Sequence, residues 1–279
     1  MRPTDPAPTT PRSSSWLTLV VAAGLAAGAG LAAGAGLAEG APPAMARGTE
    51  THVTVRALAH DAKLIGSGVG GARIAILDAG SGDTLAAGLQ RGGTGDTDLI
   101  MRSPHERGRV IYDTKGAAGF TATLSLSAPT RVRIVAEGPL GNPDATVRAS
   151  VTTLLVPGRD VGGDGIVLDL HGLAVSPQAP ASAGSGPLAV RATVTMLCGC
   201  PITPGGLWDA DSVDVRARLV RDGKVVAEAP LAYAGRASTF QGRITPPGPG
   251  EYRLVVLASE PSRANFGRAA RRIRVGGGS

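Results

Sequence analysis

The sequence predicts an all-β protein built of two β-sandwich domains in tandem behind an N-terminal export leader. Apolar and polar residues alternate along most of the chain, which is the period of a strand with one buried face. The 41 glycines and 21 prolines suit many short strands joined by tight turns. A length of 279 residues is enough for two ordinary domains and a leader.

Residues 1–46 have the pattern of a signal peptide. Residues 16–38 form a run without charge, and Ala44-Met45-Ala46 offers a small-x-small cleavage site before Arg47. The uncharged run is long enough to span a bilayer, but alanine and glycine dominate it, so cleavage is favoured over an uncleaved membrane anchor. We therefore expect the mature chain to be periplasmic or secreted, with contact to a membrane only through an uncleaved leader.

The first predicted domain covers residues 47–175. Short alternating runs such as residues 72–76, 120–126 and 166–170 are separated by turn signals, of which Gly162-Gly163-Asp164-Gly165 is the clearest. Many short strands with regular turns and no helical period predict a β-sandwich.

The second predicted domain follows a stretch of small and polar residues. Residues 176–187 hold no charge and no large apolar side chain, so we expect a linker there. Residues 188–275 repeat the alternating pattern, and Asp222-Gly223 between two apolar runs predicts a β-hairpin. This stretch fits one immunoglobulin-like β-sandwich, with residues 276–279 as a tail.

Two groups of segments carry a resemblance to known modules. Residues 71–76, 82–86 and 94–97 resemble the opening strands of carboxypeptidase-regulatory-like β-sandwich modules. Residues 246–258 resemble the late strand of many bacterial exported immunoglobulin-like domains. The resemblance implies sandwich modules of an exported protein and brings no catalytic residues with it.

The only two cysteines lie at the end of the longest alternating run. One parity of residues 188–201 is apolar throughout: Leu188, Val190, Ala192, Val194, Met196, Cys198 and Cys200. A disulfide is the default for two cysteines of an exported protein, although an extended strand holds such Cα atoms about 7 Å apart. Two thiolates beside the Met196 thioether also suit a soft metal, copper or zinc, or a redox site. Inert buried thiols or an intermolecular link are the remaining alternatives.

The loop after the cysteines is the second candidate site. Residues 202–211 contain two glycines, Trp208, Asp209 and Asp211. Loops at the ends of sandwiches are common binding sites, so we expect this loop and the cysteine pair to form the functional end of the second domain.

The net charge of +6 comes almost entirely from arginines, which are scattered singly along the predicted strands except for one cluster at residues 268–274 that alternates with apolar residues. They form no run interleaved with aromatic residues, so we expect solvated strand faces and no nucleic-acid partner.

The sequence contains no signature of a hydrolase or metalloprotease and no paired carboxylates that spacing forces together. We expect a non-enzymatic binding or accessory protein of the cell envelope that needs no cofactor and binds a protein or an envelope component. The alternative is a periplasmic soft-metal or thiol-redox protein that acts through Cys198 and Cys200.

The leader pattern predicts that native protein begins at or near Arg47 and is recovered outside the cytoplasm. The intact mass of the native protein, measured after cell fractionation, checks this. A mass that retains residues 1–46, found in the membrane fraction, would show an uncleaved anchor instead.

Overall fold

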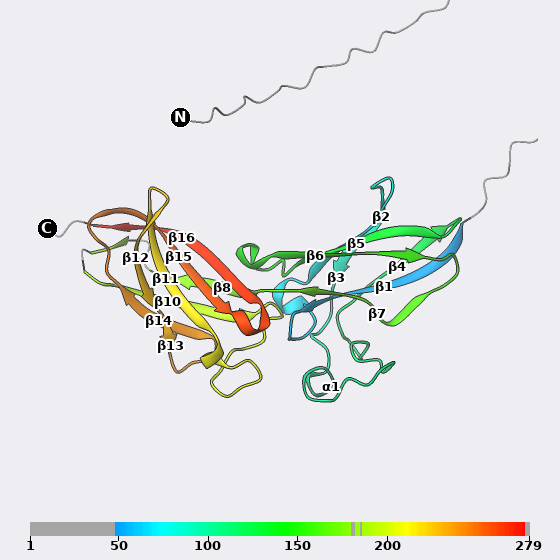
Figure 1. The fold of residues 1–279 in the computed structure, drawn as a ribbon, viewed down its shortest axis with the longest axis horizontal. Coiled ribbons are helices and arrows are strands. Elements are labelled where there is room, and N and C mark those ends of the chain that lie inside the picture. The colour runs from blue at the N-terminus through cyan, green and yellow to red at the C-terminus, as the bar shows by residue number, and fades with distance from the viewer. Residues whose placement is uncertain (1–47, 180–181, 185, 277–279) are drawn as a thin grey trace, which may run out of the picture. The chain divides into compact units, whose positions relative to one another are not determined.

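The computed structural model describes residues 48–179, 182–184 and 186–276, which belong to one compact unit, Met45–Ser279. The predicted leader and most of the predicted tail lie outside the described residues. Strands form nearly all of the regular structure (Figure 1), so the all-β prediction is confirmed. The short helices of the described part are α1 (Thr97–Met101), η1 (Ser67–Val69), η2 (Pro143–Ala145), η3 (Ala210–Ser212) and η4 (Pro261–Arg263).

The N-terminal sandwich consists of two sheets. The first has the order β4-β1-β7, with β4 (Phe120–Leu126), β1 (Thr49–Ala59) and β7 (Val161–Leu170). The second has the order β3-β2-β5-β6, with β3 (Thr84–Gln90), β2 (Ala72–Asp78), β5 (Thr130–Gly138) and β6 (Val147–Leu155). Strands β1 and β7 run parallel, and the other neighbouring strands of this sandwich are antiparallel.

Branched apolar side chains fill the space between these two sheets, as the alternation predicts. Val53, Val55, Ile74, Ile76 and Ile134 are fully buried. The polar side chain of Gln90 also lies in this core, where its amide donates to the carbonyls of Ala57 and Ile65 and its oxygen accepts from the Ala57 N–H. A buried amide is tolerated there because these bonds use its donors and its acceptor.

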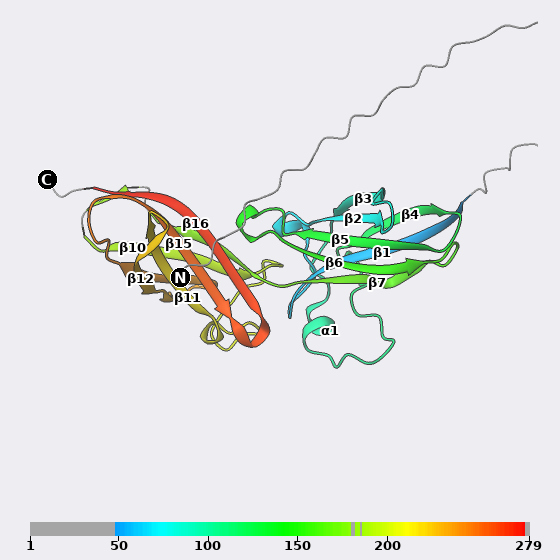
Figure 2. The same cartoon turned by 45° about the horizontal axis from the view of Figure 1, so that its top comes forward.

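The C-terminal sandwich also has two sheets. The first has the order β13-β14-β10-β8, with β13 (Ala232–Tyr233), β14 (Thr239–Ile244), β10 (Leu188–Met196) and β8 (Leu173–Gln178). The second has the order β12-β11-β15-β16-β9, with β12 (Lys224–Pro230), β11 (Asp214–Arg221), β15 (Gly250–Glu260), β16 (Asn265–Val275) and β9 (Ser182–Ala183). Strands β15 and β16 form a long hairpin (Figure 2).

The strand order of the C-terminal sandwich is that of an immunoglobulin-like domain. Lettered in chain order, β8, β10, β14 and β13 make the A-B-E-D sheet, and β11, β15 and β16 make the C-F-G sheet. The Tyr252 hydroxyl, near the start of the F strand, donates to the Gly248 carbonyl at 2.6 Å. Such a bond is the tyrosine corner of these domains, so the prediction of an immunoglobulin-like sandwich is confirmed.

The chain enters the C-terminal sandwich earlier than the composition predicts. Residues 173–178 pair with β10, although residues 173–175 fall in the predicted first domain and 176–178 in the predicted linker. Strand β8 lies at the edge of its sheet, where backbone hydrogen bonds hold it and Pro177 is tolerated. The small and polar side chains of residues 176–178 therefore concealed the second half of this strand.

Replacing Tyr252 by Phe removes the hydrogen bond to Gly248 and leaves the buried ring in place. We expect the free energy of unfolding to fall by about 1 kcal/mol, the usual net contribution of one hydrogen bond. Denaturant unfolding measures it. The control is Tyr233→Phe, because the Tyr233 hydroxyl has no hydrogen-bond partner among the described residues. An equal loss of unfolding free energy in the two variants would contradict the stabilising role of the Tyr252–Gly248 hydrogen bond.

Candidate functional site

The two cysteines lie in a tight turn that follows β10. The Gly199 N–H donates to the Met196 carbonyl, and the Met196 N–H donates to the Cys200 carbonyl. Gly199 adopts a positive φ of 78°, which closes a three-residue hairpin turn. The turn brings the cysteine Cα atoms to 5.4 Å, and the two sulfurs form a disulfide.

The disulfide agrees with the first of the alternatives that the sequence left open. Cys198 and Cys200 are bonded to each other, and the described part of the chain holds no free cysteine. Both sulfurs are therefore engaged and do not act as thiolate ligands beside Met196. As the parity predicted, Met196, Cys198 and Cys200 are all buried. Leu197 is buried as well, because the strand ends at Met196 and the alternation stops there.

Hydrogen bonds from Trp208 and to Asp209 hold the loop of residues 202–211 in place. The Trp208 ring N–H donates to the carbonyl of Asp61 in the N-terminal sandwich at 2.9 Å. The Asp209 carboxylate accepts from the N–H groups of Asp211 and Gly205, and these bonds lower the pKa of Asp209. Asp211 is exposed.

The end of the second sandwich that the sequence singled out packs against the first sandwich. A side chain at Gly199 would clash with Val69, 2.7 Å from the position of its Cβ. The Arg263 guanidinium bonds the Asp61 carboxylate at 2.7 Å, in addition to the Trp208 bond to the Asp61 carbonyl. We call this set of contacts the joint. Cys198, Cys200 and Trp208 thus lie at the joint.

A basic surface crosses the outer face of sheet β13-β14-β10-β8. It consists of two adjoining hollows of about 790 and 360 Å³ that share Gln178 and Arg191 as lining residues. The arginines that line them are Arg191, Arg236, Arg243 and Arg271. No acidic side chain lines either hollow, and within the described ranges none of the four arginines forms an ion pair. We call this surface the arginine groove.

Two arginines on the opposite sheet of the same sandwich form ion pairs. Arg216 bonds Asp214 at 2.8 Å and Glu228 at 3.1 Å, and Arg218 bonds Glu228 at 2.6 Å. The bonds to Asp214 and then Glu228 raise the pKa of Arg216, and the bonds from Arg218 and then Arg216 lower the pKa of Glu228. Arg216 and Arg218 are thus paired, whereas the four arginines of the groove are not; Arg253, Arg268 and Arg272 of the same opposite sheet also form no ion pair among the described residues.

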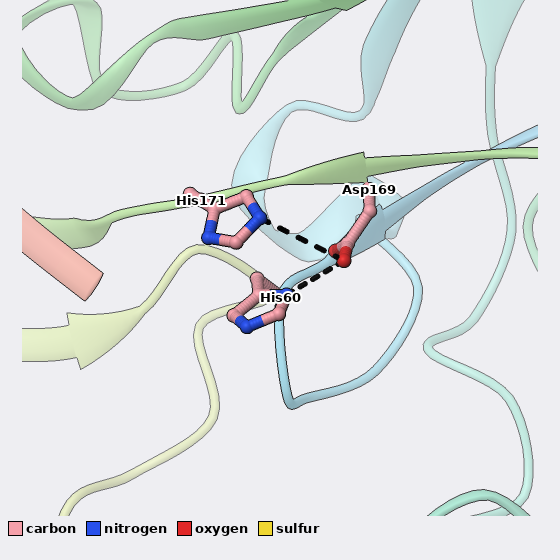
Figure 3. Close-up of side chains that lie close together, drawn as sticks. All are labelled: His60, Asp169 and His171. Atoms are coloured by element: carbon pink, nitrogen blue, oxygen red, sulfur yellow. Dashed lines mark hydrogen bonds and ion pairs between the residues drawn. The ribbon is translucent and has the colours of Figure 1, made fainter. Parts of the chain in front are cut away.

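Two histidines and an aspartate meet where β1 and β7 end (Figure 3). His60 Nδ1 lies 2.6 Å from Asp169 Oδ2, and His171 Nε2 lies 3.9 Å from the same oxygen. The two imidazole rings are stacked, with centroids 3.6 Å apart. The sequence analysis did not single out this cluster, because His60 and His171 come together only through the parallel pairing of β1 with β7.

Among the described residues, no helix is both long and apolar enough to cross a membrane.

Known proteins show little similarity to this chain. No family model matches the chain, and no curated protein matches it. A solved structure that resembles it is entitled "Crystal structure of the titin domains z1z2 in complex with telethonin". The sequences are 14% identical, the match covers 83% of this chain and 90% of that one, and the TM-score is 0.22. We draw no functional argument from that likeness.

Because Cys198 and Cys200 are buried at the joint, we expect Cys198→Ser/Cys200→Ser to be destabilised. Each hydroxyl left without a partner should cost about 1–3 kcal/mol. The control is Cys198→Ala/Cys200→Ala, which also lacks the disulfide but buries no hydroxyl, and it should unfold at higher denaturant concentration. Equal stability of the serine variant and the wild type would contradict the burial of this turn.

Proposed function

We propose that this protein is an exported, non-enzymatic binding protein of the cell envelope, and that it binds linear anionic polymers of the envelope along the arginine groove. The observation that carries the proposal is the collection of four arginines around two connected hollows without a lining carboxylate.

The chemistry of the groove suits oxyanions. A guanidinium group forms paired hydrogen bonds with carboxylate, phosphate or sulfate groups and keeps its charge at any physiological pH. Arg191, Arg236 and Arg243 are exposed, so their guanidinium groups are accessible to a ligand. The side chains of Gln178, Gln241, Thr193 and Thr239 supply further hydrogen-bonding groups along the same surface.

The extent of the groove favours a polymer over a small ion. Strands β8, β10 and β14 each contribute lining residues, and Arg271 is added from β16 of the other sheet. Several weak charge contacts along one chain add up to useful affinity, and each released counterion favours binding at low salt.

Two further observations support export. The leader pattern of residues 1–46 predicts it, and the Cys198–Cys200 disulfide is a bond that persists in oxidising compartments. The resemblance of the first sandwich to carboxypeptidase-regulatory-like modules of exported proteins belongs to the same proposal. The alternative is a soft-metal or thiol-redox protein that acts through Cys198 and Cys200, which form a buried disulfide in this structure.

The test is titration of the mature chain, residues 47–279, with inorganic polyphosphate and separately with poly-glutamate. We expect binding that weakens as salt rises, and a loss of at least about tenfold in affinity for Arg191→Gln/Arg243→Gln, since paired guanidinium bonds are strong. The matched control is Arg216→Gln/Arg218→Gln, which removes the same charge from the opposite face.

The two polymers distinguish phosphate from carboxylate as the recognised group. Equal weakening by the two double variants would show that net charge alone drives binding and would overturn the assignment to the groove. If neither polymer binds at low salt, the proposed function is overturned.

A further inference from the structure

We infer that His60, Asp169 and His171 form a binding site for a divalent transition-metal ion of the zinc type. The side chains belong to the N-terminal sandwich and lie outside the arginine groove. The inference therefore stands independently of the proposed function.

The fold places the three side chains side by side on the same face of the sheet. In the parallel pair β1 and β7, Leu58 lies opposite Asp169 and Ala59 opposite Leu170. The next N–H, that of His60, donates to the Leu170 carbonyl at 2.9 Å and continues this register past the end of β1. Ala59 and Leu170 point into the core. Because side chains alternate along a strand, His60, Asp169 and His171 project from the opposite face together.

The three side chains are close enough to reach a shared ion. One ligand atom from each residue lies within 4.8 Å of both others. Ligand atoms about 2.0–2.2 Å from a tetrahedral ion lie about 3.3–3.6 Å apart. The nitrogens of His60 and His171 lie 2.6 and 3.9 Å from Asp169 Oδ2, on either side of that separation, so side-chain rotations bring the three atoms to it. Figure 3 shows both rings beside the same carboxylate, with Asp169 nearest to His60.

The donor set selects the class of metal. Two imidazole nitrogens and one carboxylate oxygen suit zinc, copper or nickel, whereas magnesium and calcium prefer oxygen ligands alone. The side chains of His60, Asp169 and His171 are 29, 44 and 47% exposed, so an ion has access from solvent. Three protein ligands leave a coordination position for water or an external ligand.

A hydrogen-bonded pair explains only part of the cluster. The bond from His60 to Asp169 resembles the exposed pair His52–Asp160, in which an imidazole also lies beside one carboxylate at 3.3 Å. What distinguishes the cluster is the second imidazole, stacked on the first and facing the same oxygen. That second imidazole turns an ordinary ion pair into a chelating set.

The cluster is also tied to the joint. The residue after His60 is Asp61, which bonds Arg263 and Trp208, and the residue after His171 is Gly172, whose N–H donates to Asn265. An ion held by His60 and His171 would fix the ends of β1 and β7 from which these contacts start. Metal binding should therefore raise the thermal stability of the whole described unit.

The experiment is calorimetric titration of the full mature chain, produced without a histidine tag, with Zn²⁺ in metal-free buffer. We expect one Zn²⁺ per chain, no binding of Mg²⁺, and release on acidification because protons compete for the imidazoles. His171→Ala and Asp169→Asn should each weaken Zn²⁺ binding at least about tenfold. His52→Ala is the matched control and should leave it unchanged.

A second measurement reports the ligand atoms of the bound metal and does not depend on the stability of the variants. Cu²⁺ bound to the wild-type chain should show coupling to two imidazole nitrogens in its electron paramagnetic resonance spectrum, and His171→Ala should reduce the coupling to one. Circular dichroism confirms that each variant is folded. The inference is overturned if Zn²⁺ does not bind, if His52→Ala weakens binding as much as His171→Ala, or if the spectrum shows no imidazole nitrogen.

Discussion

The parallel pairing of β1 with β7 is the constraint on which the rest of the structure depends. Parallel neighbours end at the same edge of a sheet, so the segment that follows β1 and the segment that follows β7 begin side by side. After β7, only His171 and Gly172 precede β8, which already belongs to the second sandwich. After β1, the turn at Asp61 supplies the groups that Trp208 and Arg263 contact. The joint and the histidine cluster thus share one origin.

The short connection also explains why the two sandwiches share one core. Buried apolar residues form a continuous cluster that runs through both, from Val53 in β1 to Val275 in β16. The cysteine turn and Trp208 belong to that cluster. A disulfide in such a place keeps an apolar turn closed where the other sandwich packs on it.

Much of the fold could be predicted from the sequence because alternation is a local property of a strand. The runs at residues 72–76, 120–126 and 166–170 all lie in strands of the N-terminal sandwich. The edge strand β8 escaped prediction, because its residues 176–178 are held by backbone bonds that any side chain permits. The burial of Cys198 and Cys200 followed from parity, but their disulfide needed a turn whose geometry the residues alone did not determine.

The functional surfaces depend on which strands become neighbours, and that is not local information. His60 and Asp169 are separated by 109 positions and meet through strand pairing. The arginines of the groove come from β10, β14, β16 and the turn after β13, and in the sequence they look no different from Arg216 and Arg218.

What separates the two sets of arginines is the placement of carboxylates. Asp214 and Glu228 lie on the sheet that carries Arg216 and Arg218, whereas the surface around Arg191 and Arg243 receives no such residue. What distinguishes the groove is therefore the absence of carboxylates among its lining residues, which the net charge does not reveal.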